Sequence, residues 1–451
     1  MQDPEGAARP GRTVGPSRRD AVAGLADAIR RIDRDNDRIR AFVALADRDE
    51  QRSLAHAAAE RLAAGAPRSP LDGVPIGVKD NIDTADLPTA MGSGLYADRI
   101  PPKDAPVVAR LRAAGALIIG KTNLTELACG TEGTNDYFGD VLNPVMPDRF
   151  PGGSSSGSAA AIAAGMVPMT VGSDTSCSIR NPAASCGVVG LKPSRGRVPN
   201  DGVSVCNKLL DTVGPMAASC EDAAALLSVL QDPSWPDPVA ALSEPLPVLR
   251  IGVLSGRFRD GCDTAVAGGL DRLLTQLRAL GHELHDVDLG IDPTEADSQV
   301  NVLCRDMLAV YGQDVAAAPA GLVGREVRHW FAEYETVSDA DYAAAMAYRE
   351  ASAAAAADVL RGFDVVICPT ARTLPARIDR TANRAENGSD GDRADRAENC
   401  SVWNLAGLPS LSVPVRPSGP DGPPVGMLLN GAHGSDGRLL TLGAALGASG
   451  R

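Results

Sequence analysis

The chain has 451 residues, of which 44% are apolar, so it can bury a large core, and its length alone would allow two or three domains. Its formal net charge of -13 argues against nucleic acid or an anionic membrane surface as the main partner. The 9 cysteines are odd in number and include no Cys-x-x-Cys pair, which favours reduced thiols in a cytoplasm over a disulfide framework or a zinc site.

No signal peptide or membrane span is predicted. Residues 1–20 are rich in Arg, Pro and Gly and lack the apolar run that a signal peptide needs. No segment reaches the run of about 18 apolar residues that suggests a membrane helix. We therefore expect residues 1–20 to form a disordered tail.

The first predicted elements are two helices with a short strand between them. Apolar residues recur at helical spacing from Val22 to Ile32, and a second helix is predicted over residues 47–64, ending at Gly65. Alternation over residues 39–43 predicts the strand. These elements would enclose a core rather than carry chemistry.

A strand-helix-strand unit follows. Alternating apolar residues over 74–78 predict a strand that ends at Lys79, residues 104–115 predict a helix, and residues 116–120 predict a second strand. Such a unit forms a crossover between parallel strands. Because ligands bind at the carboxyl ends of parallel strands, Lys79 falls where chemistry is expected.

Glycine, serine and small apolar residues are densest over residues 150–193. A helix is predicted from Ser158 to Ala164, then a strand over residues 166–171 and a turn that carries Ser178. Successive amides of residues 175–178 would surround one point, as in turns that hold anions, and a serine hydroxyl becomes a nucleophile once a base lies beside it. Two hydroxyl clusters flank the helix, namely Ser154, Ser155 and Ser156, and Ser173, Ser176 and Ser178.

Histidine is the usual base beside a nucleophilic serine, but no histidine lies in this stretch. Only a histidine brought in by folding could serve, because all five lie outside this stretch, at His56, His282, His285, His329 and His433.

The second half of the chain alternates helices with strands, predicted over residues 248–254 and 365–368. Residues 377–399 are polar and charged and are predicted to form a mobile surface loop. No internal repeat is evident.

Three motifs occur in one order along the chain: Gly73-Val74-Pro75-Ile76-Gly77-Val78-Lys79-Asp80, Gly152-Gly153-Ser154-Ser155-Ser156-Gly157-Ser158 and Gly172-Ser173-Asp174-Thr175-Ser176-Cys177-Ser178-Ile179-Arg180. Together they resemble the amidase signature family, serine amidohydrolases whose base is a lysine, and the similarity runs from about residue 29 to about residue 440. The resemblance implies one α/β domain over residues 21–451, with a mixed, mostly parallel twisted central sheet covered by helices on both faces. It places a signature core at about 70–220 and a variable substrate-side region at about 221–400.

The resemblance also implies roles for individual residues. Ser178 would be the nucleophile, Lys79 the neutral base, and Ser154, after a cis peptide bond, the relay between them. Lys79 can accept a proton only if desolvation lowers its pKa from about 10.4. The remaining implied positions are the oxyanion hole, formed by the backbone amides of Thr175, Ser176 and Cys177 through Ser178, and the supporting residues Ser155, Asp174 and Arg180.

Other interpretations of these residues stay open. Lys121 also ends a predicted strand and is a competing base. The segment from Gly153 to Gly157 matches G-x-S-x-G, the nucleophile elbow, although prolines rather than a strand precede it. Cys177 could be proposed as the nucleophile, but no histidine stands nearby in sequence to form a thiolate.

The expected function is hydrolysis of a small-molecule carboxamide through an acyl-serine intermediate. No metal, organic cofactor, nucleic acid or membrane is implied as a partner, and a homodimer is one oligomeric state left open. The first alternative is a subunit of a glutamine-dependent amidotransferase, although Asn181 stands where such subunits commonly have glutamine. The second is a non-catalytic relative, suggested by Ser176-Cys177 where the family usually has Gly-Gly.

The substrate pocket is expected between the loops at about 125–140 and the half of the chain after Pro215. Neither segment shows an obvious charged or aromatic clamp. With 3% aromatic residues in the chain, a large planar acyl group is disfavoured. Arg328 could face a substrate carboxylate, although a surface position on a helix is the favoured explanation.

Overall fold

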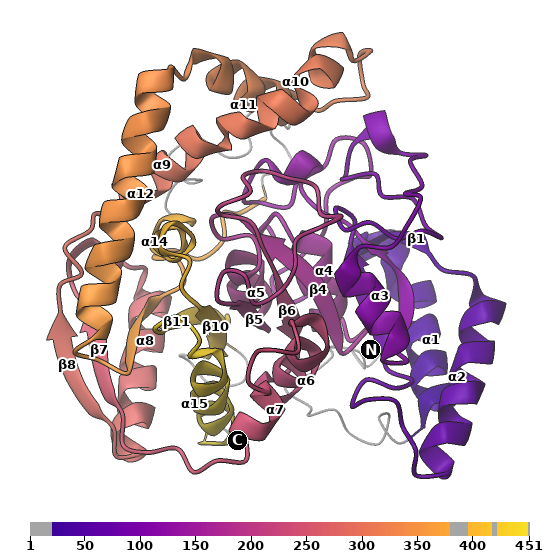
Figure 1. Cartoon of the computed structure of the whole chain (residues 1–451), viewed down its shortest axis with the longest axis horizontal. Helices are drawn as coiled ribbons and strands as arrows, with labels where there is room; N and C mark the ends of the chain where they lie inside the picture. The colour runs from indigo at the N-terminus through magenta and orange to yellow at the C-terminus, as the bar shows by residue number, and fades with distance from the viewer. Residues whose placement is uncertain (1–19, 379–395, 417–421, 450–451) are drawn as a thin grey trace, which may run out of the picture.

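The computed structural model describes residues 20–378, 396–416 and 422–449. All but Asp20 of the predicted tail, and most of the loop predicted at 377–399, lie outside the described residues. The strands of the described chain form one 11-stranded sheet in the order β1-β3-β2-β4-β6-β5-β10-β11-β9-β7-β8. Figure 1 shows this sheet crossing the middle of the molecule, with helices around it.

The strands are short and most are buried along their whole length. They are β1 (Phe42–Leu45), β2 (Pro75–Lys79), β3 (Leu117–Thr122), β4 (Met169–Asp174), β5 (Val189–Lys192), β6 (Thr212–Ala217), β7 (Arg250–Leu254), β8 (Glu283–Val287), β9 (Val365–Pro369), β10 (Ser410–Val415) and β11 (Val425–Asn430).

The helices lie at the two ends and on both faces of the sheet. They are α1 (Ala21–Ile39), α2 (Arg48–Ala63), α3 (Pro106–Ala113), α4 (Ser156–Ala163), α5 (Arg180–Cys186), α6 (Cys220–Leu230), α7 (Pro238–Ala241), α8 (Thr264–Ala279), α9 (Pro293–Leu303), α10 (Met307–Ala317), α11 (Arg325–Thr336), α12 (Asp339–Leu360), α14 (Glu398–Ala406) and α15 (Asp436–Ser449).

The predicted mixed α/β sheet is confirmed, but it is not mostly parallel. Four neighbouring pairs are parallel, β3-β2, β2-β4, β9-β7 and β7-β8, and the other six are antiparallel. The predicted crossover is present, since β2 and β3 are parallel. The strands β4 and β5 also run in one direction, but β6 lies between them and pairs antiparallel with both. The predicted helix between two strands therefore did not show whether those two strands are neighbours in the sheet.

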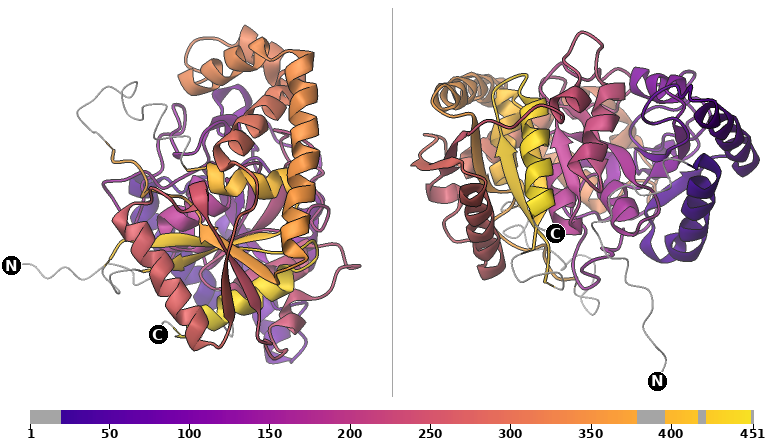
Figure 2. Two further views of the ribbon diagram at one scale, coloured as in Figure 1. Left: turned by 90° about the vertical axis from the view of Figure 1, so that its left-hand side faces the viewer. Right: turned by 90° about the horizontal axis from the view of Figure 1, so that it is seen from below.

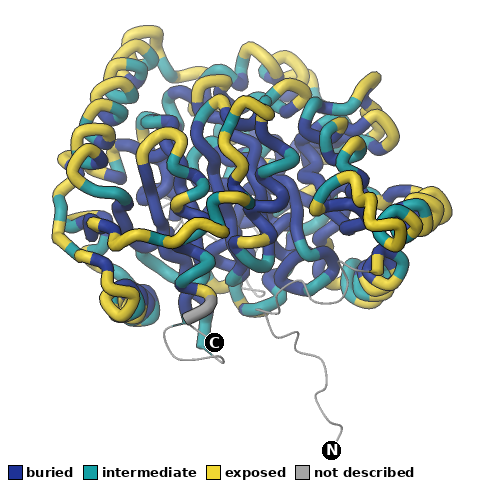
Figure 3. The backbone as a smooth tube through the Cα atoms, turned by 60° about the horizontal axis from the view of Figure 1, so that its bottom comes forward, coloured by how far each residue is buried: buried dark blue, intermediate teal, exposed yellow. Residues whose placement is uncertain are grey.

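Alternating side chains bury both faces of the sheet. In β9, Val365 and Ile367 pack into the cluster formed with α3, α6, α8 and α15, whereas Val366 and Cys368 pack into the cluster that includes α9 to α12 and α14. Figure 2 shows the twist of the sheet, with α14 and α15 on opposite sides, and Figure 3 shows the buried core beneath an exposed outer layer of helices. This double coverage explains why the central strands are continuous apolar runs.

The helix α4 is buried along its whole length because its side chains are small. Its sequence, Ser-Gly-Ser-Ala-Ala-Ala-Ile-Ala, lets neighbouring backbone approach closely. A Cβ added at Gly157 would lie 2.4 Å from the carbonyl oxygen of Ala41 and 2.6 Å from the backbone nitrogen of Asn123. Glycine is therefore required at this position.

The end of the loop predicted at 377–399 is not mobile surface, which corrects the sequence prediction. Arg396 is 4% exposed and donates to Asn181 Oδ1 at 2.7 and 3.0 Å and to the carbonyl oxygen of Thr373 at 2.8 Å. The helix α14 begins at Glu398, which is buried and accepts from Arg372 at 2.7 Å. Composition alone predicted exposure here because these charges find their partners far away in sequence.

We predict that Gly157→Ala lowers the free energy of unfolding by about 1–3 kcal/mol, because the new methyl group overlaps two backbone atoms. Gly447→Ala in α15 is the matched control. A Cβ there meets no atom within 4 Å, so this change leaves stability equal or raises it by about 0.4–1 kcal/mol. Urea unfolding of both variants is the measurement, and equal midpoints would contradict the packing argument.

Candidate active site

Lys79 lies at the carboxyl end of β2 with its side chain fully buried. Its Nζ donates to Ser154 Oγ at 2.8 Å and to Ser173 Oγ at 2.9 Å. The acid beside it in sequence, Asp80, pairs instead with Lys121 at 3.6 Å. Burial lowers the pKa of Lys79 to about 8, although nearby Cys206, Asp174, Asp211 and Cys177 oppose the shift. Lys79 is thus an amine held by hydroxyls.

Ser154 follows a cis peptide bond from Gly153, as the resemblance implied, and is fully buried. The next residue connects this segment to Ser178, since the Ser155 amide donates to the carbonyl oxygen of Ser178 at 3.1 Å. The Ser155 hydroxyl donates to the carbonyl oxygen of Ser173 at 3.2 Å. Ser154 and Ser178 are therefore in neighbouring segments, but no hydrogen bond between described residues joins their hydroxyls.

The turn from Thr175 to Ser178 connects β4 to α5. Its four backbone amides donate to no described residue, although the neighbouring amide of Ile179 is bonded to Asp174. The Thr175 hydroxyl donates to Asp211 Oδ1 at 2.7 Å. Unpaired amides at adjacent positions form a site for an anion.

The residues that replace Gly-Gly, Ser176 and Cys177, face different surroundings. Ser176 borders the pocket described below, whereas Cys177 is fully buried in the apolar core. Neither has a positive φ, since the only described residues other than glycine that do are Arg40, Met91, Leu127 and Ala128. Burial also raises the pKa of the Cys177 thiol well above its ordinary value, which argues against a thiolate nucleophile.

Asp174 and Arg180 form a fully buried ion pair behind the turn. Arg180 Nη2 donates to Asp174 Oδ1 at 2.8 Å and to the carbonyl oxygen of Ser176 at 2.7 Å. Asp174 also accepts the amide of Ile179 at 3.0 Å. Arg180 and these hydrogen bonds outweigh burial and hold the pKa of Asp174 at about 2. The pair fixes both ends of the turn.

Lys121, the competing base, has a different environment. Its Nζ donates to the carbonyl oxygen of Ile82 at 2.7 Å and to Thr89 Oγ1 at 2.6 Å, in addition to its pair with Asp80. Burial lowers its pKa to about 8 as well, so the pKa does not separate the two lysines. Geometry does, because only Lys79 contacts a serine of the two hydroxyl clusters.

The nucleophile-elbow interpretation does not fit the structure. No strand leads into Gly153, since residues 142–155 form loop and turn before α4 begins at Ser156. That elbow requires a strand-to-helix turn.

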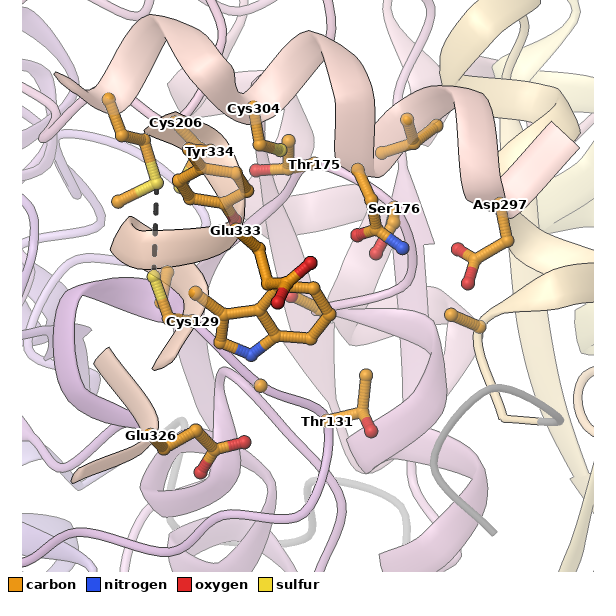
Figure 4. Close-up of a pocket in the computed structure, with 18 of the residues that line it drawn as sticks. Cys129, Thr131, Thr175, Ser176, Cys206, Asp297, Cys304, Glu326, Glu333 and Tyr334 are labelled. Carbon is orange, nitrogen blue, oxygen red and sulfur yellow. Dashed lines mark hydrogen bonds between the residues drawn. The ribbon is translucent and has the colours of Figure 1, made fainter. Parts of the chain in front are cut away.

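A pocket with a volume of about 430 Å³ borders the turn at Ser178, within the size range of small-molecule sites. Figure 4 shows Ser176 and Asp297 on one side, Cys129 on the other, and Glu333 between them. The complete lining is Ala128, Cys129, Gly130, Thr131, Thr175, Ser176, Ser178, Cys206, Asp297, Val300, Asn301, Cys304, Met307, Glu326, His329, Trp330, Glu333, Tyr334 and Ala397.

This lining corrects the expectation of no charged or aromatic clamp. Trp330 and Tyr334 stack with their ring centroids 6.1 Å apart. Folding also brings in one histidine, His329, whose ring packs against Trp330. Arg328 instead points its guanidinium at the end of α10, donating to the carbonyl oxygen of Val315 at 3.4 Å.

Sequence reasoning assigned no supporting role to several residues that hold the site in place. Ser173 and Asn81 are bonded at 3.0 Å and place a hydroxyl against Lys79. Asn181 donates to the carbonyl oxygens of Thr131 and Gly153 at 2.8 and 3.4 Å, and accepts from Arg396. The position of Ser173 in a motif was an available signal, but nothing in the local pattern pointed to Arg396.

Comparison with known proteins agrees with this fold. A family model for amidases matches residues 24–440. A curated relative, one of the subunits of the glutamyl-tRNA(Gln) amidotransferase of Chloroflexus aurantiacus (strain ATCC 29366 / DSM 635 / J-10-fl), is 36% identical over 453 residues, covering 92% of this chain and 91% of that protein.

Two solved structures are also similar. One, described as an amidase, is 33% identical with a TM-score of 0.83 and covers 96% of this chain and 97% of its own. The other comes from work on a vestigial protein complex and the evolutionary origins of an s-triazine catabolic enzyme. It is 30% identical with a TM-score of 0.87 and covers 96% of each chain.

The architecture is thus that of the serine-type amidohydrolases. The chain belongs to the amidase signature family. Across the described ranges, no helix combines the length and apolar character that crossing a bilayer requires.

We predict that Arg180→Met lowers the free energy of unfolding by about 3–5 kcal/mol, because it leaves Asp174 buried without its cationic partner. Arg257→Met is the control, since Arg257 pairs with Asp292 at an exposed site where a salt bridge contributes about 0–1 kcal/mol. Denaturant unfolding at neutral pH measures both, and equal losses would contradict a structural role specific to the buried pair.

Proposed function

We propose that this protein hydrolyses a small-molecule carboxamide through an acyl-serine intermediate, with Ser178 as nucleophile, Ser154 as relay and Lys79 as base. The observation that carries the proposal is the 2.8 Å hydrogen bond from the buried Lys79 amine to Ser154, in a segment bonded to Ser178. The proposal places the reaction in the cytoplasm and requires no metal or organic cofactor.

The first half of the reaction forms the acyl enzyme. Ser178 Oγ attacks the amide carbon and gives its proton to Ser154 Oγ, while Ser154 gives its own proton to the neutral Lys79 amine. This path requires that one of the two side chains rotates so that a hydrogen bond forms between the hydroxyls of Ser154 and Ser178. The carbonyl oxygen becomes an oxyanion, and the unpaired amides of Thr175 to Ser178 are suited to bind it.

The second half releases both products. The tetrahedral intermediate expels the nitrogen, which takes a proton back along the path from Lys79 through Ser154 and leaves as ammonia or an amine. Water then attacks the acyl-Ser178 carbonyl, with the same path accepting the proton of that water. The carboxylic acid departs and Ser178 regains its hydroxyl.

A second candidate function is that of one component of a glutamine-dependent amidotransferase. The curated relative of 36% identity, which is named as part of a glutamyl-tRNA(Gln) amidotransferase, favours it. The pocket supports hydrolysis of another amide, because its charged lining residues are Asp297, Glu326 and Glu333 and no Lys or Arg of the described chain borders it. A free glutamine would place its carboxylate among these acids without a cationic partner.

Two measurements distinguish these functions. One is the rate of glutamine turnover by the chain alone, and the other is whether a second protein stays bound when the chain is purified from its native source. The hydrolase proposal expects an amide panel to include substrates turned over faster than glutamine by the chain alone. Glutamine as the best substrate, together with a second protein that stays bound through purification, would favour the amidotransferase.

We predict that Ser178→Ala abolishes amide turnover and labelling by a fluorophosphonate, because both need the same hydroxyl. Lys79→Ala should lower turnover by at least about a hundredfold, the scale of general base catalysis. Ser228→Ala in α6 is the control. Among the described residues its hydroxyl bonds only the carbonyl oxygen of Ala225, so this variant should retain both activities. Labelling that persists in Ser178→Ala would refute the assignment, and absence of labelling in the unmodified chain would indicate a non-catalytic relative.

We predict that kcat/KM rises with pH through about 8 and levels above it. Lys79 acts as a base only when neutral, and its pKa is lowered to about 8 by burial. Asp211→Asn removes a negative charge that raises the Lys79 pKa, so the inflection should move to lower pH. Asp271→Asn, at an exposed position of α8, should leave the inflection unchanged. An unmoved inflection in Asp211→Asn would contradict Lys79 as the titrating group.

A further inference from the structure

Two helices, α9 and α11, each direct one row of side chains, here called a stripe, to the pocket. On α9 and the turn after it, the stripe is Asp297, Val300, Asn301 and Cys304, and on α11 it is Glu326, His329, Trp330, Glu333 and Tyr334. Spacings of three, four and seven residues put these side chains on one face of each helix. Both helices belong to the group at the top of Figure 1, so this wall comes from a part of the chain remote in sequence from the candidate catalytic residues.

The charge of this wall is negative. Its carboxylates are Asp297, which accepts from Ser401 Oγ at 2.5 Å, Glu326, which accepts from Thr134 Oγ1 at 3.1 Å, and Glu333. Two guanidinium groups near the wall point elsewhere. Arg328 bonds carbonyl oxygens at the end of α10, and Arg396 bonds Asn181, Ser185 and the carbonyl oxygen of Thr373.

Glu333 is an exposed residue of α11 that borders the pocket. Its side chain forms no hydrogen bond or ion pair with any described residue, and Figure 4 shows its carboxylate in the middle of the pocket. Beside it, Trp330 stacks on Tyr334 with an interplanar angle of 25°, and its Nε1 is buried without a hydrogen-bond partner among the described residues. A carboxylate next to an indole face is a favourable environment for an organic cation.

Another part of the pocket is apolar and lined by sulfur-containing side chains. Cys129, Cys206, Cys304 and Met307 contribute to it, and Cys129 Sγ lies 3.8 Å from Met307 Sδ. Burial raises the pKa of Cys129 and Cys304 well above the ordinary thiol value, so these groups are neutral and suited to contact hydrocarbon. The pocket thus combines an apolar surface with acidic groups.

We propose that the preferred substrate is an amide carrying an organic cation, such as a primary ammonium group, joined to the amide by a short hydrocarbon chain. The hydrocarbon lies against the sulfur-lined surface, and the cation is bound by Glu333 and the face of Trp330. This inference rests on the proposed function for its catalytic consequence, but the binding preference can be measured without turnover.

Turnover is tested with three amides of similar length: 6-aminohexanamide, hexanamide and the monoamide of adipic acid. The unmodified chain should show the highest kcat/KM for the cationic amide, about tenfold above the neutral one, and the lowest for the anionic one. Glu333→Gln should reduce the ratio of cationic to neutral kcat/KM by about fivefold or more. Glu335→Gln, an acid two residues further along α11 that is exposed like Glu333 but lies outside the pocket, should leave this ratio unchanged.

Binding is tested by calorimetry on the Ser178→Ala variant, with 6-aminohexanamide and hexanamide as the probes. Tighter binding of the cationic amide, lost on adding Glu333→Gln, supports the inference. Tighter binding of this kind without turnover by the unmodified chain supports the inference while overturning the proposed function. Turnover or binding with no preference for the cationic amide, or a preference unaltered by Glu333→Gln, overturns the inference alone.

Discussion

The amine of Lys79 is buried at the end of β2 with hydroxyls rather than a carboxylate as its neighbours. An amine removed from water and without a carboxylate in direct contact binds its proton less tightly, which is the condition for a base near neutral pH. The parallel register of β2 and β4 brings Lys79 beside Ser173, and its amine also donates to Ser154, which follows the cis peptide bond. The position of the Lys79 side chain at the end of β2 therefore determines which hydroxyls its amine contacts.

Lys121 shows that burial alone does not define a base. It lies one strand away, is equally buried, and has its pKa lowered to about the same value, yet its Nζ is directed to Asp80 and to the loop at 82–89. The two lysines differ in what they touch. Lys121 holds the loop at 82–89 in place. Lys79 contacts the hydroxyl of Ser154, whose segment is bonded to Ser178 at the border of the pocket.

The parts predictable from sequence were those encoded by local pattern. Alternation predicted the strand that ends at Lys79, and the family resemblance implied the cis bond before Ser154. The resemblance also named Asp174 and Arg180 as supporting residues, but their ion pair was not predicted. The insertion of β6 between β4 and β5 was not predictable, because no local pattern specifies which strands pair. The acidic and aromatic pocket wall was missed for a related reason. Trp330 and Glu333 look like residues of an ordinary amphipathic helix until the chain places α11 over the turn at Ser178.

The two stripes on α9 and α11 come from one stretch of the chain, and the hydroxyls and amine come from another. Under the proposed function, mutations in these helices therefore alter which amides are accepted while Lys79, Ser154 and Ser178 keep their positions. Substrate preference and amide chemistry would then respond to substitutions in two separate parts of the chain.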